Sequence, residues 1–293
     1  MHFRRIVLAL VATFIAIVLA PPSAFAAAPA LELRVMSFNL RYASDRPPNA
    51  WPARRPVMQH LIEHEAPDLI GTQEGLFAQL QDLATDLPAY RWIGLGRAGG
   101  SRDEFAAVFF RHDRFEPVAF DHFWLSDTPE VIGSMTWGNR YRRMVTWVRF
   151  RDRASGREFY FWNTHFDHEV ESARVKSAEL IRQRLADLDP SLPLLLVGDF
   201  NCAAGRSAAY EILTRDAGLV DTWTLARRRT NEDLNTFHDY QPARHARERI
   251  DWILARPAPD VSSAAIVTFR ENYQPPSDHF PVTATVSFPA SSP

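Results

Sequence analysis

Residues 194–201, Leu-Leu-Leu-Val-Gly-Asp-Phe-Asn, place the strongest constraint on how this 293-residue chain can fold. The apolar run 194–197 does not alternate with polar residues, which is typical of a strand buried on both faces. Asp199 and Asn201 follow it two residues apart, so they point to one side of an extended chain. An acid and an amide are poor strand formers and are rarely buried without a partner. The stretch therefore predicts a buried strand that carries two polar side chains to a functional site.

Four further polar clusters are expected to converge on Asp199 and Asn201. Nearly all of the oxygen and imidazole donors in these clusters lie at or just beyond the end of an apolar strand. A further donor, Asp251, lies inside an apolar strand. The four clusters are Ser37-Phe38-Asn39, Gln73-Glu74, Asn163-Thr164-His165-Phe166-Asp167-His168 and Ser277-Asp278-His279.

The order of expected elements favours one domain, over residues 27–293, with many strands and few helices. Apolar periodicity predicts helices at 51–65, 76–87, 170–188 and 207–213. Core strands are expected at 31–40, 68–74, 194–197, 249–254, 264–269 and 282–288, a hairpin at 144–164, and a loop at 227–249. No internal repeat or interdomain linker interrupts this pattern. The fold class is therefore α/β (α+β), with two packed sheets flanked by helices.

The first 26 residues have the pattern of a cleaved secretory signal peptide. Arg4 and Arg5 precede an apolar run over 6–20, and Ala24-Phe25-Ala26 supplies a small-residue cleavage site. The alternative, a membrane anchor, is disfavoured because the run is short for a span of roughly 20 residues and prolines follow it. We expect a periplasmic or extracellular protein without stable membrane insertion after cleavage, and we assume a monomer.

Charge and cysteine content narrow the function classes. The formal net charge is −2, from 33 Lys+Arg and 35 Asp+Glu, so the chain has no general electrostatic reason to follow a nucleic-acid backbone. Its single cysteine, Cys202, excludes an intramolecular disulfide. We expect Cys202 to act as a small buried hydrophobic residue and not as a nucleophile.

The donor types favour a hard divalent cation. Carboxylate and amide oxygens without thiolates suit Mg²⁺, with Mn²⁺ or Ca²⁺ as alternatives. Zinc is disfavoured because no closely spaced His, Cys or Asp pair resembles a zinc-ligand motif. With two histidines nearby, this set suggests attack of water on a phosphoester, in which a carboxylate orients or deprotonates the water and imidazoles neutralise the phosphoryl oxygens.

Six motifs in order resemble those of the endonuclease/exonuclease/phosphatase superfamily. They cover nearly the whole mature chain, from about residue 33 to 288, and any one of them alone is weak. The resemblance implies a four-layer α-β-β-α sandwich of two mixed sheets flanked by helices, with the site at one edge of both sheets. The motifs are Ser-Phe-Asn-Leu-Arg-Tyr (37–42), Gln-Glu (73–74), Asn-Thr-His-Phe-Asp-His (163–168), Gly-Asp-Phe-Asn (198–201), Arg-Ile-Asp-Trp-Ile (249–253) and Ser-Asp-His-Phe-Pro-Val (277–282).

By motif match, the resemblance implies that five residues bind the metal or act on the attacking water. Asn39 and Glu74 would hold the cation, and Asp278 would support it or its neighbour. Asp199 would orient or activate the attacking water, with Asn201 assisting and contacting the phosphate.

The resemblance also implies that two histidines contact the phosphate group of the substrate. His279 would bind and neutralise it, oriented by Asp251, and His165 occupies the position of a second phosphate-contacting residue. From the residues themselves, burying Asp251 in an apolar strand is costly unless it is paired, and pairing with His279 removes that cost.

Substrate contacts are expected at the rim of the site. Arg is suited to forked contacts with phosphate, with surface salt bridging as the alternative, and the candidates are Arg41, Arg143 and His238. An aromatic wall for a sugar or base could come from Trp51, Trp137 and Tyr141, although we expect two of the three to serve packing. Strand alternation places His168 on the opposite face from His165, so His168 is interpreted as structural.

The leading hypothesis is an exported, metal-dependent phosphoester hydrolase. The acidic balance favours a small-molecule or a lipid- or glycan-derived phosphoester over nucleic acid as its substrate. One alternative is an extracellular non-specific nuclease. Another is a non-catalytic binding module on the same fold, which is disfavoured because a lapsed enzyme should have lost at least one of the matched catalytic residues.

Overall fold

The computed structural model describes residues 29–290, and the expected signal peptide lies outside them. In this part of the chain, thirteen strands form two sheets. Within residues 29–290, no helix is long and apolar enough to span a membrane.

The first sheet has seven strands in the order β10-β12-β13-β1-β2-β4-β3. Along that order the strands are Arg228–Thr230, Asp260–Ile266, Val282–Phe288, Leu31–Asn39, Leu69–Leu76, Glu104–Arg111 and Tyr90–Ile93. The second sheet has six strands in the order β5-β6-β7-β8-β11-β9. These are Phe115–Trp124, Met144–Asp152, Glu158–His165, Leu194–Asp199, Asp251–Arg256 and Val220–Asp221.

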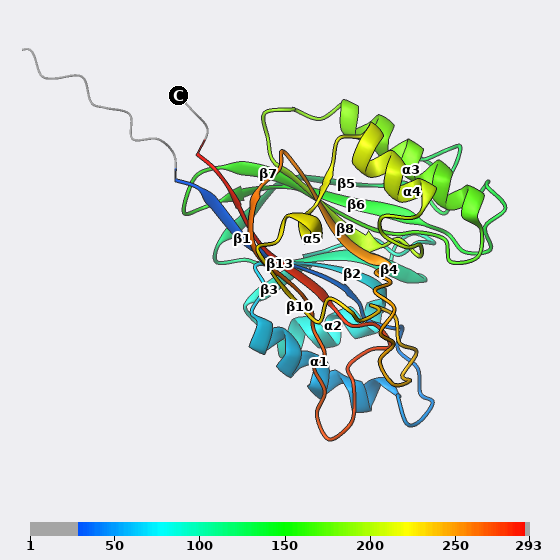
Figure 1. Cartoon of the computed structure of the whole chain (residues 1–293). Coiled ribbons are helices and arrows are strands. Elements are labelled where there is room, and N and C mark those ends of the chain that lie inside the picture. The colour runs from blue at the N-terminus through cyan, green and yellow to red at the C-terminus, as the bar shows by residue number, and fades with distance from the viewer. Residues whose placement is uncertain (1–28, 291–293) are drawn as a thin grey trace, which may run out of the picture.

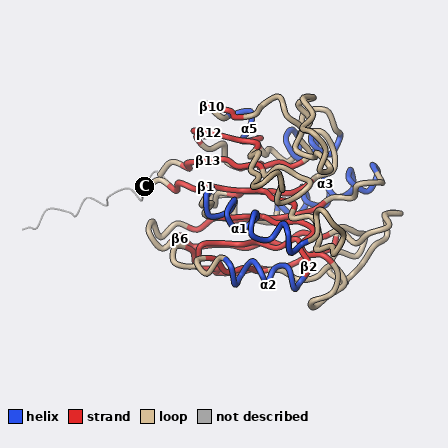
Figure 2. Tube along the Cα trace, turned by 90° about the horizontal axis from the view of Figure 1, so that it is seen from below, coloured by secondary structure: helices blue, strands red, loops and turns tan. Residues whose placement is uncertain are grey.

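Helices cover the outer faces of both sheets, as Figure 1 and Figure 2 show. Helices α1 and α2 lie against the first sheet, and α3 and α4 lie against the second. The helices are α1 (Trp51–Glu65), α2 (Phe77–Asp86), α3 (Glu171–Ala186), α4 (Ala208–Glu211), which continues as a π-helical turn (Ile212–Asp216), and α5 (Thr222–Leu225). The four-layer sandwich predicted above is confirmed.

Alternating side chains explain why both central strands are buried on two faces. In β8, Leu195 and Val197 face the core between the sheets, whereas Leu194 and Leu196 pack under α3. In the second half of β1, Val35 faces the shared core, whereas Met36 and Phe38 pack under α1 and α2. A stretch buried on both faces needs an apolar residue at nearly every position, which is why residues 194–197 of β8 read as a continuous apolar run.

Strand directions bring the polar ends together. Strands β1 and β2 pair in parallel, as do β7 and β8, so each pair finishes at one edge. Strand β11 runs antiparallel to β8 and begins there, with Asp251 opposite Asp199. Strand β13 runs antiparallel to β1, so the residues just before it, 277–281, lie at the same edge.

The helices over 51–65, 76–87 and 170–188 are confirmed with small end shifts. The strand expected at 264–269 is instead Asp260–Ile266, because Val261 and Ser263 pair with β13 across a bulge. The segment 227–249 is mostly loop but contains the short exposed edge strand β10. Polar edge strands of this kind have no apolar pattern from which they could be predicted.

Gly71 is required where the two sheets approach closely. A Cβ at this position would lie 2.2 Å from Val197 Cγ2 and 2.8 Å from Asn163 Oδ1. We therefore expect Gly71→Ala to lower the free energy of unfolding by about 2–3 kcal/mol through overpacking, measured by urea denaturation. The double variant Gly71→Ala/Val197→Ala should show a favourable coupling energy relative to the two single variants. If the effects of the two single variants on the free energy of unfolding were strictly additive, the contact between residue 71 and Val197 would not be the cause of the destabilisation.

Candidate active site

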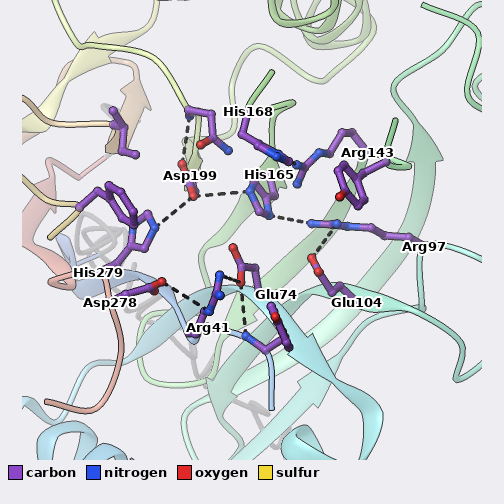
Figure 3. A pocket seen from close by; sticks show the side chains of 15 residues that line it. Arg41, Glu74, Arg97, Glu104, Arg143, His165, His168, Asp199, Asp278 and His279 are labelled. Carbon is purple, nitrogen blue, oxygen red and sulfur yellow. Dashed lines mark hydrogen bonds and ion pairs between the residues drawn. The ribbon is translucent and has the colours of Figure 1, made fainter. Parts of the chain in front are cut away.

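One cavity of about 440 Å³ lies at the edge where the polar strand ends meet. Figure 3 shows its charged side chains pointing toward one another from both sheets. It contains most of the residues singled out from the sequence, together with several that were not. The lining residues are Arg41, Tyr42, Glu74, Arg97, Glu104, Tyr141, Arg143, His165, His168, Asp199, Asn201, Phe237, Ile250, Asp278 and His279.

Three residues at the cavity have left-handed backbone conformations that favour glycine. The φ angles are 52° at Arg41, 64° at Glu74 and 50° at Asn201. Glu74 lies within β2, where the pairing with β4 shifts register between Thr72 and Gly75. A bulge of this kind turns a side chain out of the regular alternation. Clustering of such conformations is typical of functional sites, where surrounding structure offsets the local strain.

Asp199, His279 and Asp251 form a buried charge relay. His279 Nδ1 lies 3.0 Å from Asp251 Oδ2, and His279 Nε2 lies 3.8 Å from Asp199 Oδ2. Burial and the nearby Asp251 charge raise the pKa of Asp199 to about 7. Burial acts to lower the pKa of His279, but the charges of Asp251 and Asp199 outweigh it and raise the pKa to about 10. His279 is thus a buried imidazolium at neutral pH.

Asn39 lies beneath the cavity and joins two carboxylates. Its amide nitrogen donates to Glu74 Oε1 at 3.0 Å and to Asp199 Oδ2 at 2.9 Å. Its oxygen accepts the backbone N–H of Arg41 at 2.9 Å. Burial acts to raise the pKa of Glu74, but the Asn39 hydrogen bond and the charges of His279 and Arg41 lower it. In this arrangement Asn39 turns its nitrogen, and not its oxygen, toward the carboxylates.

Arg41 lies between two of the predicted metal ligands. Its Nη1 is 3.8 Å from Glu74 Oε2, and its Nε is 3.5 Å from Asp278 Oδ2. Burial raises the pKa of Asp278, although the His279 charge opposes the shift. The fully buried Arg54 of α1 supports this corner by donating to five backbone carbonyls, those of Leu40, Arg41, Tyr42, Asn49 and Pro276.

Arg97 and Glu104 belong to the site but were missed by the sequence analysis. Arg97 is 2 % exposed; its Nη1 lies 2.6 Å from Glu104 Oε2, and its Nη2 lies 2.6 Å from His165 Nδ1. The glycine-rich segment 94–101 around Arg97 was the only available signal, since it marks a loop beside a buried strand. Nothing in the sequence singles out Glu104, the first residue of β4.

His168 corrects one expectation. The alternation argument placed it away from the site, but β7 ends at His165, so alternation no longer applies three residues later. His168 lines the cavity and accepts at Nδ1 a hydrogen bond of 2.8 Å from Arg143 Nη2. Burial and the neighbouring Arg97 lower the pKa of Arg143 to about 10. Asp167 caps the segment that leads into α3 by accepting backbone N–H groups.

Some candidates do not reach the cavity. Trp51 donates its indole N–H to Asp82, and Trp137 donates to Asp127, so of the three aromatic candidates only Tyr141 lines the cavity. Cys202 is half-buried, and burial raises the pKa of its thiol to about 11. A thiol in that state is a poor nucleophile, in agreement with the expectation.

His238 lies behind the cavity and is not among its lining residues. It is 5 % exposed and its ring stacks on Phe280 at 4.1 Å. Burial and the His279 charge lower the pKa of His238 to about 4.

The buried His238 should make the fold acid-sensitive. The unfolded chain, with a histidine pKa near 6.5, binds this proton more readily than the folded chain between about pH 6.5 and 4. The free energy of unfolding therefore falls as the pH drops through this window. We expect His238→Phe to remove about 2 kcal/mol of that pH dependence, measured by urea denaturation in EDTA at pH 7 and pH 4.5. If the free energy of unfolding still fell by the same amount between pH 7 and pH 4.5 in the variant, groups other than His238 would cause the acid sensitivity.

The donor set fits a hard divalent cation. Glu74, His165 and Asp199 bring ligand atoms within 4.8 Å of one another, and so do Asp199, Asp251 and His279. The second group is disfavoured because a protonated His279 has no lone pair to offer. In the first group, the half-buried Glu74 and the buried Asp199 supply two carboxylates at the cavity, which suits Mg²⁺ or Mn²⁺.

Known proteins resemble this chain in both sequence and structure. A family model described as Endonuclease/Exonuclease/phosphatase matches residues 36–279. Among solved structures, an endonuclease/exonuclease/phosphatase family protein from Bacteroides thetaiotaomicron is 34% identical with a TM-score of 0.83, covering 88% of this chain and 98% of that one. A mannosyl-6-phosphatase from the same species is also 34% identical, with a TM-score of 0.82, covering 87% of this chain and all of that one.

A curated relative matches a smaller part of the chain. A protein of Acanthamoeba polyphaga mimivirus, described as uncharacterized, is 32% identical over 163 residues, which are 52% of this chain. The match spans 59% of that protein.

Proposed function

The chain belongs to the endonuclease/exonuclease/phosphatase family, whose members hydrolyse phosphoester bonds, and we propose that it is an exported, divalent-metal-dependent phosphoester hydrolase acting on a phosphorylated sugar. The observation that carries this proposal is the imidazolium of His279 beside Asp199 and opposite Glu74 in one cavity. A positive donor, a carboxylate with a pKa near neutrality and a cation-binding acid are the parts that phosphoester hydrolysis needs.

Glu74 would hold the cation, with Asp278 supporting it. When bound, the cation polarises a phosphoryl oxygen and neutralises charge on the phosphate. Asn39 holds Glu74 and Asp199 at a fixed separation through its amide nitrogen.

Side chains of the protein accept the proton of the attacking water and bind the phosphate. Asp199, whose pKa is about 7, takes the proton of the attacking water at Oδ2. His279 donates its Nε2–H to a non-bridging phosphoryl oxygen, and Asp251 holds the ring from the other side. Asn201 fixes the orientation of Asp199, because its backbone N–H donates to Asp199 Oδ1 at 3.0 Å.

The cavity suits a small ligand better than a nucleic acid. Its volume of about 440 Å³ is that of a small-molecule site. The formal net charge of −2 gives no general attraction for a polyanion. The similarity to a mannosyl-6-phosphatase supports a sugar phosphate as substrate.

Purified mature protein, residues 27–293, tests the proposal. It should release phosphate from mannose 6-phosphate and related sugar phosphates with Mg²⁺ or Mn²⁺, and EDTA should abolish the release. Plasmid DNA and bis-p-nitrophenyl phosphate should be cleaved far more slowly. Hydrolysis that is insensitive to EDTA would overturn the metal proposal, and rapid cleavage of DNA alone would favour the nuclease alternative.

Export can be tested separately. Residues 1–26 fused to a reporter that matures only outside the cytoplasm should yield active reporter, with cleavage after Ala26 seen by N-terminal sequencing. An uncleaved, cytoplasmic reporter would contradict periplasmic or extracellular localisation.

A further inference from the structure

The hydrogen bond between Arg97 and His165 determines where the imidazole proton lies. Arg97 Nη2 is 2.6 Å from His165 Nδ1. A guanidinium has only N–H donors and no acceptor, so Nδ1 must accept. In a neutral imidazole the proton then resides on Nε2.

That Nε2 atom faces the reacting centre. It lies 3.5 Å from Asp199 Oδ2 in a cavity where His165 itself is only 3 % exposed. Figure 3 shows His165 between Asp199 on one side and Arg97 on the other. A proton on Nδ1 would point at the Arg97 guanidinium, whose Nη2 lies 2.6 Å away. A second proton on the ring is therefore disfavoured.

Arg97 is itself held in place. Its Nη1 pairs with Glu104 Oε2 at 2.6 Å, and its backbone carbonyl accepts the indole N–H of Trp124 at 2.7 Å. With 2 % exposure it has little room to change rotamer. Along the cavity wall, the chain Glu104–Arg97–His165 thus links the first residue of β4 to the last residue of β7.

We propose that Arg97, braced by Glu104, is a positioning residue that fixes His165 as a neutral Nε2–H donor to a phosphoryl oxygen. In this role His165 neither accepts the proton of the attacking water nor binds the metal. The inference rests on the proposed phosphoester hydrolysis and deepens it, because it separates the tasks of the two cavity histidines. His279 supplies a charged donor and His165 a neutral one.

The proposal also narrows the metal site. A histidine binds a cation through a ring nitrogen that carries no proton. With Nδ1 accepting from Arg97 and Nε2 protonated, His165 has no free lone pair. Of the group Glu74, His165 and Asp199, His165 is thus excluded as a ligand, and with Asp199 serving as the base Glu74 remains to hold the cation.

A second pair in the chain serves as a matched control. Arg143 Nη2 donates to His168 Nδ1 at 2.8 Å, the same contact as in the first pair. His168 Nε2, however, lies 3.6 Å from Glu169 on a side chain that is 45% exposed. Changes at Arg143 should therefore alter the tautomer of His168 and leave that of His165 unchanged.

Nitrogen NMR of histidine-labelled mature protein reads the tautomer directly. We expect His165, assigned by loss of its signals in His165→Gln, to show an unprotonated Nδ1 and a protonated Nε2, with and without Mg²⁺. In Arg97→Met/Glu104→Gln, which removes both charges of the ion pair together, His165 should become a mixture of tautomers. In Arg143→Met the tautomer of His168 should change, whereas His165 should keep an unprotonated Nδ1 and a protonated Nε2. A proton on Nδ1, or a metal-dependent shift at Nε2, would overturn the proposal without any reference to activity.

Kinetics then test the role. A glutamine amide can place an N–H near the Nε2 position, whereas leucine cannot. We expect His165→Gln to retain kcat within about 10-fold of wild type and His165→Leu to lose about 100-fold, with KM changing less than kcat in both. Arg97→Met/Glu104→Gln should lower kcat about 10-fold.

Equal losses for glutamine and leucine would show that His165 transfers a proton or binds metal. Absence of phosphatase activity in wild type, with the Nε2–H tautomer present, would count against the proposed function and not against the positioning by Arg97.

Discussion

His279→Asn is expected to lower kcat/KM by about 10³–10⁴-fold, which corresponds to about 4–5 kcal/mol of transition-state stabilisation. The variant removes the imidazolium that lies 3.8 Å from Asp199 Oδ2. Without that charge, Asp199 faces buried Asp251 with less compensation, so its pKa should rise above the value of about 7. Both binding of the phosphoryl oxygen and proton transfer from water are then impaired. The measurement is steady-state kinetics on the sugar phosphate that the wild type hydrolyses best.

Asp251→Asn is the matched variant for the same relay. It keeps the size of the side chain that holds His279 Nδ1 at 3.0 Å but removes its charge, so the pKa of His279 should fall. We expect a smaller loss than in His279→Asn and a pH–rate profile whose alkaline limb moves to lower pH. Circular dichroism and urea denaturation check that both variants fold. Near-wild-type activity of folded His279→Asn would contradict the site assignment.

Glu74→Gln is expected to abolish metal-stimulated activity and to weaken Mn²⁺ binding by about 100-fold or more. The amide preserves shape but removes the negative charge that a hard cation requires. In wild type a bound cation should raise the unfolding temperature, because it binds only the folded state. In the variant that increase should disappear, while the unfolding temperature in EDTA stays close to that of the wild type. Titration calorimetry with Mn²⁺ and thermal unfolding provide the two measurements.

Glu63→Gln is a suitable control for this substitution, because Glu63 is an exposed acid on α1, away from the cavity. It should bind Mn²⁺ and hydrolyse substrate like the wild type. Tight Mn²⁺ binding by Glu74→Gln would place the cation elsewhere in the molecule.

The parts of the site that follow from strand ends were predictable from the sequence. An acid or amide after a continuous apolar run, as at Asp199, has few explanations other than a site at the end of a buried strand. Because Asp251 lies in an apolar strand, burying its charge required a partner, and His279 is that partner. Once two sheets are predicted, parallel pairing brings such ends to one edge.

The rest depends on loop conformation, which has no periodicity. Arg97 reaches His165 because the 94–101 loop folds back over β4, and no spacing in the sequence encodes that path. The position of His168 required knowledge of where β7 ends. The orientation of the Asn39 amide is set by the left-handed backbone of Arg41, whose N–H occupies the amide oxygen. Such details depend on tertiary contacts and not on local pattern.

The division of the active site between two sheets has a consequence for biogenesis. Glu74 comes from the first sheet and Asp199 from the second, and they come together, both bonded by Asn39, only when the sheets have docked. His279 lies near the end of the chain, so the last strand must be synthesised and paired before the relay exists. A chain that crossed the membrane unfolded would therefore have no assembled active site until the two sheets had docked at its destination.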